Sequence, residues 1–146
     1  MKRLHQLKGR TLELSHYEIT KQFDVYALGN YDFHDNLDFG DVPGVYIFTK
    51  RDMDTTIPNG YNKQMYQHEL IYCGATEGLE GRFCGHFHAK EIQDMGATHI
   101  SIHLCSSKDE AFELEGLVLS KLKFPVNEKG NDNPKFPNVK KVVEAF

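Results

Sequence analysis

Short runs of β-branched and aromatic residues predict three β-strands in this chain. The strands cover residues 44–49 (GVYIFT), 68–75 (HELIYCGA) and 98–105 (THISIHLC). In the third strand, apolar residues alternate with histidine and serine, a pattern typical of a strand with one buried and one exposed face. We therefore expect a small sheet whose third strand is half-buried.

Two segments with helical spacing follow the second and third strands. Residues 78–94 have an apolar stripe, although two glycines weaken their helical propensity. Ser107 and Glu110 have the spacing of a capping box, which predicts a helix from about 108 to 123, before a proline. From residue 44 the order is β-β-α-β-α, which predicts an α/β domain with one small sheet.

The first third of the chain has a different residue pattern. A second capping-box pattern, Ser15 with Glu18, predicts a helix over 16–25, and the turn-rich acidic segment 29–44 predicts a loop. The expected organisation is an N-terminal extension at 1–43, a central domain at 44–128 and a C-terminal tail at 129–146.

The charge of −4 argues mildly against a nucleic-acid-binding protein, but the charges are unevenly distributed. Residues 1–10 carry four basic residues, whereas most of the acidic excess lies in 11–43. We therefore expect the basic arm at 1–10 to contribute to binding of a polyanion.

No apolar run reaches 18 residues, so we expect no membrane span and no membrane partner. The basic start lacks the apolar region of a signal peptide, and the three cysteines are expected to be reduced thiols. These features predict a cytoplasmic protein.

A carboxylate lies within the apolar stripe of the last predicted helix. At 100° per residue, Glu115 falls between Ala111 and Leu119 on the face that should be buried, whereas Glu113 falls on the polar face. Such a carboxylate must have a partner, hold a metal or line a cleft, because leaving it unpaired is costly. A buried ion pair, for instance with Arg82, is the structural alternative.

Two further pairs of residues could take part in catalysis or ligand binding. Arg82 and His86 are separated by four residues, so on a helix they share one face, where they suit a phosphate or a solvated surface equally. Tyr46 and Tyr72 lie in strands that would be neighbours, where packing is the ordinary role of a tyrosine.

Sulfur and imidazole side chains offer a rival site, for zinc. The residues concerned are Cys84, His86, His88, His103 and Cys105. Their spacing fits no common structural-zinc pattern, and Cys84 and His86 would point to opposite sides of a helix.

Taken together, several short motifs resemble the GIY-YIG nuclease superfamily over residues 44–127. The matching residues, in order, are Gly44-Val45-Tyr46, Tyr72-Cys73-Gly74, Arg82, His86, Glu115 and Asn127, the last behind Pro125. The departures are a valine and a cysteine at the middle positions of the two tripeptides and a long loop or hairpin connection at 50–67.

The resemblance implies a fold and a mechanism. The fold is a central three-stranded, mostly antiparallel sheet flanked by helices, and the activity is hydrolysis of DNA phosphodiester bonds by a metal-dependent endonuclease. Glu115 would hold Mg²⁺ or Mn²⁺, Tyr46 would act as general base with help from Tyr72 or His86, and Arg82 would neutralise phosphate charge. Asn127 would orient the site by hydrogen bonding.

Further substrate contacts are expected beside this site. Four residues are predicted to touch the substrate: Gly74, Lys50, Arg51 and Lys63. Two alternatives remain open, namely a non-catalytic module that binds nucleic acid or a protein partner on the same fold, and a zinc-binding adaptor.

Overall fold

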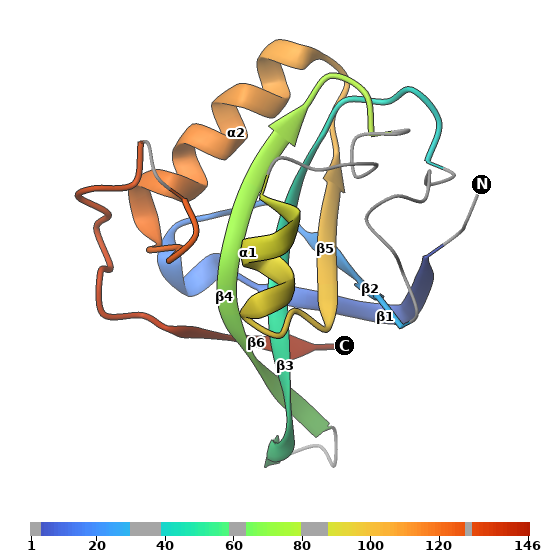
Figure 1. Ribbon diagram of the computed structural model, residues 1–146, viewed down its shortest axis with the longest axis vertical. Coiled ribbons are helices and arrows are strands. Elements are labelled where there is room, and N and C mark those ends of the chain that lie inside the picture. Colours follow the sequence, from blue (N-terminus) through green and yellow to red (C-terminus); the bar gives the residue numbers. More distant parts are fainter. Residues whose placement is uncertain (1–3, 30–38, 59–63, 80–87, 128–129) are drawn as a thin grey trace.

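Six strands form a closed barrel in the computed structural model, which describes residues 4–29, 39–58, 64–79, 88–127 and 130–146 (Figure 1). The strands are β1 (His5–Glu13), β2 (Phe23–Ala27), β3 (Gly44–Pro58), β4 (Gln64–Thr76), β5 (His99–Leu104) and β6 (Lys141–Ala145). The helices are the 3-10 turn η1 (Ser15–Tyr17), α1 (Ala89–Asp94) and α2 (Lys108–Lys121).

The strand order around the barrel is β1-β2-β5-β3-β4-β6, and each of these neighbouring pairs is antiparallel. The expectation of an α/β fold with a mostly antiparallel sheet is confirmed. The expected three strands do form its centre, as β4, β3 and β5, but three strands is wrong as a total. β1 and β2 from the N-terminal segment and β6 from the C-terminal tail complete the barrel.

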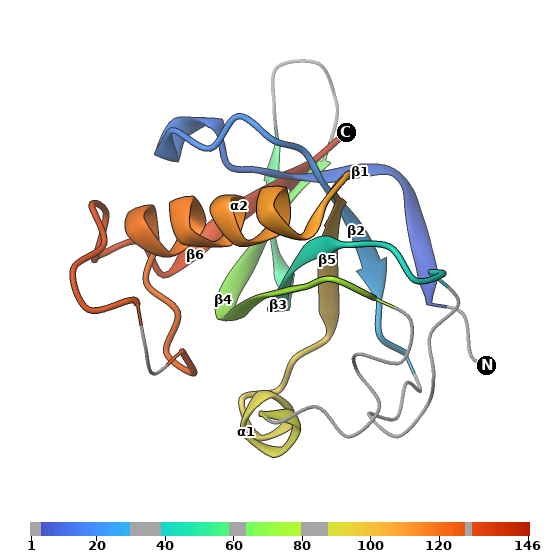
Figure 2. The same ribbon diagram turned by 90° about the horizontal axis from the view of Figure 1, so that it is seen from above.

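The central strands are covered on both faces. Seen from above, α1 lies on one side of β3, β4 and β5, while α2 lies on the other side with β1 and β6 (Figure 2). One core cluster contains Val45 and Ile47 of β3, and the other contains Tyr46 and Phe48. Alternate residues of a strand face opposite sides, so both faces of the sheet are apolar core.

Strand β5 is therefore more buried than its alternating pattern predicted. Ile100 and Ile102 are buried as expected, but on the other face His99 is 7% exposed and Ser101 is fully buried. The half-buried interpretation is wrong because the barrel interior encloses the polar face too. Leu104, expected in the core, is 54% exposed at the end of the strand.

The predicted helix at 16–25 is wrong. Only Ser15–Tyr17 form a 3-10 turn, which Glu18 ends in the left-handed conformation at φ 65°. The Glu18 carboxylate binds Lys121 and Lys135, at 2.7 and 2.5 Å, rather than capping a helix. Phe23 and Val25 are instead fully buried at the two-residue spacing of β2.

Two other segments differ from the sequence prediction or refine it. The polar stretch 50–67 is mainly strand, since β3 and β4 continue as a hairpin that projects beyond the barrel (Figure 1). Of the predicted helix at 78–94, the structure has α1 from Ala89, and 80–87 lie outside the described residues. The domain boundaries at 43/44 and 128/129 stay a prediction.

Helix α2 matches its prediction closely. The Ser107 hydroxyl accepts a hydrogen bond from the Glu110 backbone N–H at 3.1 Å, which is the predicted N-cap. Five apolar side chains of the predicted stripe are buried against the barrel: Ala111, Leu114, Val118, Leu119 and Leu122. The local signals for this helix agree with its packing, which is why the prediction succeeded.

A buried polar network links β1, β3, β4 and β6. Glu144, fully buried, accepts hydrogen bonds from Arg10 Nε at 3.0 Å and Nη2 at 2.8 Å, and from Arg51 Nη2 at 2.5 Å. Its other oxygen lies 3.0 Å from His68 Nε2, and His68 Nδ1 lies 2.7 Å from the Thr49 hydroxyl. The network joins strands that are distant in sequence and fixes how the barrel closes.

This network and His99, whose ring packs against that of His68, make stability sensitive to acid. Burial, then the neighbouring His68 and Arg51, lowers the pKa of His99 from 6.5 to about 4. Burial alone would raise the pKa of Glu144, but hydrogen bonds and charges from His68, Arg10 and Arg51 outweigh it and lower that pKa from 4.5 to about 2. The folded state therefore binds fewer protons than the unfolded state in two pH ranges, one between the two pKa values of His99 and one between those of Glu144.

We expect the free energy of unfolding to fall as pH drops from about 6.5 to 4, through His99, and again from about 4.5 to 2, through Glu144. Denaturant unfolding measured at several pH values checks this. His99→Gln should reduce the pH dependence between 6.5 and 4 without removing it, because burial also lowers the pKa of His68, whereas the exposed His16→Gln should leave it unchanged. A stability that stays constant between pH 6.5 and 4 in the unmodified protein contradicts the expectation.

Among the described residues, none of the helices combines the length and the hydropathy needed to cross a membrane.

Candidate active site

Two tyrosines predicted to share a site are neighbours on β3 and β4. The ring centroids of Tyr46 and Tyr72 are 6.2 Å apart, and Tyr46 stands opposite Gly74 in the strand register. A Cβ placed on Gly74 would overlap the Tyr46 hydroxyl oxygen. Gly74, predicted as a substrate contact, thus has a steric reason to be glycine, because the phenol lies directly over its backbone.

Asn127 binds the same stretch of β4 from the chain that follows α2. Its side-chain oxygen accepts from the Cys73 backbone N–H at 2.9 Å, and its side-chain nitrogen donates to the Cys73 carbonyl at 2.9 Å. The Val126 N–H also donates to the Ile71 carbonyl at 3.1 Å. The Asn127 amide therefore pairs with the β4 edge as a neighbouring strand would, beyond the point where β6 pairing ends at Glu69.

Glu115 approaches this stretch from α2. It is partly buried, consistent with its predicted place in the apolar stripe. Burial and, after it, the charge of Glu115 raise the pKa of the Cys73 thiol well above its usual value of 9.0. Four predicted catalytic residues therefore border residues 72–74 of β4. The Tyr46 and Tyr72 rings lie on the α1 face of the sheet, Glu115 lies on the α2 face with Cys73, and Asn127 lies along the β4 backbone.

Other predicted site residues lie elsewhere or are not described. Arg82, His86 and Lys63 lie outside the described residues. Lys50 is exposed, and its side chain lies beside Gly96, in the turn after α1. Arg51 does not face the tyrosines but lies in the buried network, bound to Glu144.

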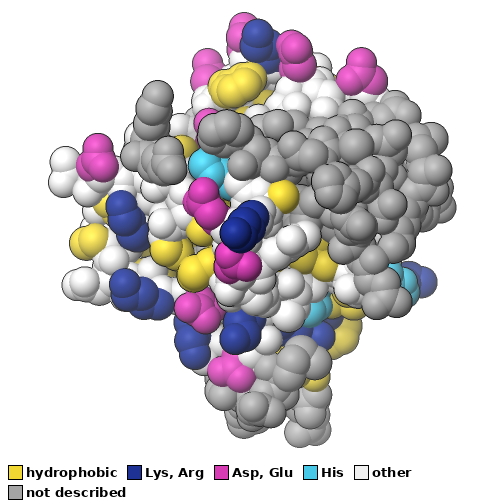
Figure 3. All heavy atoms as spheres, viewed as in Figure 1, with side chains coloured by type: hydrophobic (Ala, Val, Ile, Leu, Met, Phe, Trp, Pro, Cys, Tyr) yellow, Lys and Arg dark blue, Asp and Glu magenta, His cyan; other side chains and the backbone are white. Residues whose placement is uncertain are grey.

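The predicted basic arm is also partly engaged in the fold. His5–Glu13 form β1, and Arg10 is only 7% exposed, with its guanidinium on Glu144. Arg10 is therefore bound within the barrel, and the contribution of residues 1–10 to polyanion binding stays a prediction. On the face seen in Figure 3, the described Lys and Arg side chains lie interspersed with Asp and Glu side chains.

His88 is a site residue that sequence reasoning considered only as a zinc ligand. Its ring centroid lies 5.1 Å from that of Tyr72, at the start of α1. Its Nδ1 lies 3.5 Å from a Glu91 carboxylate oxygen. No motif distinguishes His88 in the sequence, because its position depends on how α1 packs against β4.

No family model, curated protein or solved structure matches this chain. The likeness to the GIY-YIG superfamily therefore rests on the motif residues alone.

Gly74→Ala should destabilise the protein by about 1–3 kcal/mol, the usual cost of forcing extra volume into a packed core. The added methyl would overlap the phenol of Tyr46, which is fully buried and has no free space to move into. Gly116→Ala is the matched control: its Cβ meets nothing within 4 Å in α2, so it should be neutral or stabilising. Equal denaturation midpoints for Gly74→Ala and the unmodified protein would contradict the close approach.

Proposed function

We propose that this protein is a divalent-metal-dependent endonuclease that hydrolyses phosphodiester bonds in DNA. One observation carries the proposal: Tyr46, Tyr72, Asn127 and Glu115, which lie far apart in the sequence, all border residues 72–74 of β4, the two tyrosines on the α1 face and Glu115 on the α2 face. A packing role explains each residue singly, but not why phenol, amide and carboxylate groups all border the same three residues of β4.

In the proposed reaction, Tyr46 accepts a proton from the attacking water. A free phenol has a pKa of about 10, so it needs nearby groups that stabilise its ionised form. Tyr72 lies against Tyr46, and His88 lies against Tyr72, so the phenol and imidazole nearest to Tyr46 are on the α1 side of the sheet. Asn127 keeps β4 in place beneath these rings.

The residues present fit a hard divalent cation. Glu115 offers a partly buried carboxylate, the ligand type that Mg²⁺ and Mn²⁺ prefer. When bound, the cation supplies positive charge to the scissile phosphate and completes its coordination with water. Arg82, which follows β4 in the sequence, is the proposed second source of positive charge for the phosphate.

One observation favours a second candidate, a non-catalytic module that binds nucleic acid or a protein partner. The Tyr46 side chain is fully buried, whereas a general base must reach the attacking water. Within this candidate, the intermixed charges in Figure 3 favour a protein partner, because they offer a polyanion little long-range attraction.

Cleavage assays on the full chain separate the two candidates. Supercoiled plasmid, linear duplex, single-stranded DNA and RNA are each incubated with protein in Mg²⁺ or in EDTA. The nuclease proposal expects cleavage of DNA in Mg²⁺ and none in EDTA. Binding by gel shift without cleavage in Mg²⁺ or Mn²⁺ on all substrates would favour the binding module.

A further inference from the structure

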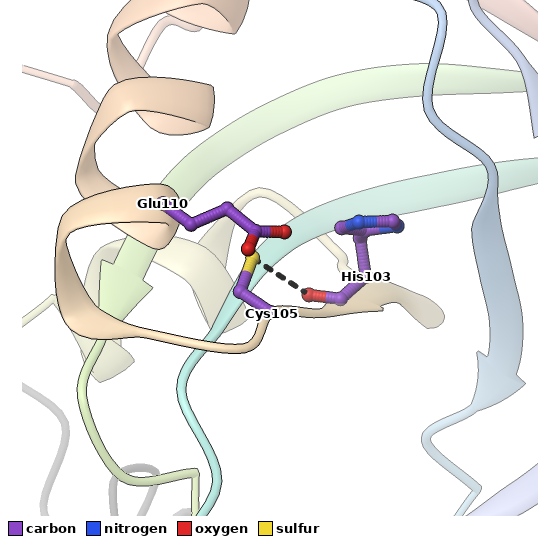
Figure 4. A group of neighbouring side chains, drawn as sticks. All are labelled: His103, Cys105 and Glu110. Atoms are coloured by element: carbon purple, nitrogen blue, oxygen red, sulfur yellow. Dashed lines mark hydrogen bonds between the residues drawn. The ribbon is translucent and has the colours of Figure 1, made fainter.

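A second group of side chains with metal-ligating chemistry lies at the junction of β5 and α2. His103 is the next-to-last residue of β5, Cys105 follows the strand, and Glu110 is in the first turn of α2. One nitrogen, one sulfur and one oxygen atom of these residues all lie within 4.8 Å of one another (Figure 4). The tight turn between strand and helix brings the three side chains to one side.

A hydrogen bond determines which nitrogen of His103 can bind a metal. Its Nδ1 lies 2.8 Å from the Gln22 carbonyl oxygen, which can only accept a hydrogen bond. Nδ1 must therefore carry the proton, which leaves Nε2 with a lone pair. Metal-binding histidines commonly have this arrangement, in which a backbone carbonyl fixes the tautomer through the other nitrogen.

The other two side chains also keep donor atoms available. Oε2 of Glu110 accepts hydrogen bonds from the Ser106 backbone N–H and hydroxyl, whereas Oε1 has no hydrogen-bond partner among the described residues. Cys105 is a free thiol, 5% exposed, and within the described part of the chain its Sγ makes only a long contact of 3.8 Å to the His103 carbonyl. The helix cap thus occupies one Glu110 oxygen and positions the other.

An open cavity of about 580 Å³ borders the cluster on the His103 side. It is lined by His103, Lys21 and Asp24, together with Thr20, Gln22, Ile102 and Leu104. Water and ions can therefore reach His103 from solvent. The cavity also leaves room for a water molecule as a further ligand.

We propose that His103, Cys105 and Glu110 bind a zinc-class divalent cation, with water completing the coordination. Nitrogen, thiolate and carboxylate together suit borderline-soft Zn²⁺ or Co²⁺ rather than Mg²⁺, which prefers oxygen ligands alone. The thiol releases its proton to solvent when the metal–sulfur bond forms.

This site is separate from the tyrosine cluster and does not depend on the proposed nuclease activity. In the strand register His103 stands beside Val45, whereas Tyr46 stands beside Ile102. Adjacent residues of a strand point to opposite faces, so His103 and Tyr46 lie on opposite sides of the sheet.

Titration of the reduced, metal-free full chain with Co²⁺ tests the proposal. We expect a single equivalent to bind with a sulfur-to-cobalt charge-transfer absorption, and Zn²⁺ to displace it. Cys105→Ser should abolish the absorption band, and His103→Gln should weaken Co²⁺ affinity at least tenfold. Circular dichroism of each variant verifies that the fold is retained.

Cys84→Ser is the matched control, since Cys84 belongs to the rival sulfur and imidazole set with His86 and His88. It should leave both the absorption band and the affinity unchanged. Loss of the band in Cys84→Ser with retention in Cys105→Ser would overturn the assignment. Co²⁺ binding without sulfur absorption, or no binding at all, would overturn it too.

Discussion

Glu144→Gln should lower the free energy of unfolding by about 3–5 kcal/mol, the usual loss when one partner of a buried ion pair is removed. Glu144 is fully buried and binds Arg10, Arg51 and His68 through its two oxygens. Glutamine keeps the shape but removes the charge, so two buried guanidinium groups lose their counter-charge. Its amide nitrogen would also face donors where an oxygen now accepts.

Urea or guanidinium unfolding at neutral pH measures this effect. Glu69→Gln on β4 is the control, because Glu69 is partly exposed and joins no such network of described residues. It should change stability by no more than about 0.5 kcal/mol. The slope of the denaturation curve should stay the same if only stability changes. A loss below about 1 kcal/mol for Glu144→Gln would mean that the network does not hold the barrel closed.

Glu115→Gln should reduce metal-dependent cleavage by at least about 10²–10³-fold while the protein stays folded. The substitution keeps the size of the side chain within the buried stripe of α2 but removes the charge proposed to hold the cation. Glu113→Gln, two residues away on the exposed face, is the matched control and should keep full activity.

The alternative role of Glu115 gives a different result. If Glu115 is only half of a structural ion pair, Glu115→Gln should be destabilised by about 3–5 kcal/mol. Unchanged stability together with unchanged cleavage would exclude both roles. Thermal unfolding and cleavage rates measured on the same preparations separate these outcomes.

The parts of the fold that could be predicted are those with local signals. The capping box of Ser107 and the stripe of α2 are local, and the structure has both. The same capping-box pattern at Ser15 gave a wrong helix prediction. Pairing with β1 and β5 stabilises β2 more than helical hydrogen bonds would stabilise a short isolated helix. The Arg10–Glu144 pair spans 134 residues, so no local pattern reveals it.

The site was predictable only through its resemblance to a family. Periodicity identifies Glu115 as misplaced, but it does not say that Asn127 binds Cys73, 54 residues away. From the sequence, Gly74 is only a residue near the end of a predicted strand. The structure gives the physical reason for glycine there, which is the close approach of the Tyr46 phenol. His88 was missed because its contact with Tyr72 arises from tertiary packing.

The single-turnover rate of DNA cleavage in Mg²⁺, compared between the unmodified protein and Tyr46→Phe, tests the central claim most directly. Phenylalanine removes only the hydroxyl that lies over Gly74 and keeps the buried ring. If Tyr46 is the general base, the rate should fall by about 10²–10⁴-fold, with DNA binding and the unfolding midpoint nearly unchanged. Cleavage by Tyr46→Phe at the unmodified rate, or no metal-dependent cleavage by the unmodified protein, would contradict the account.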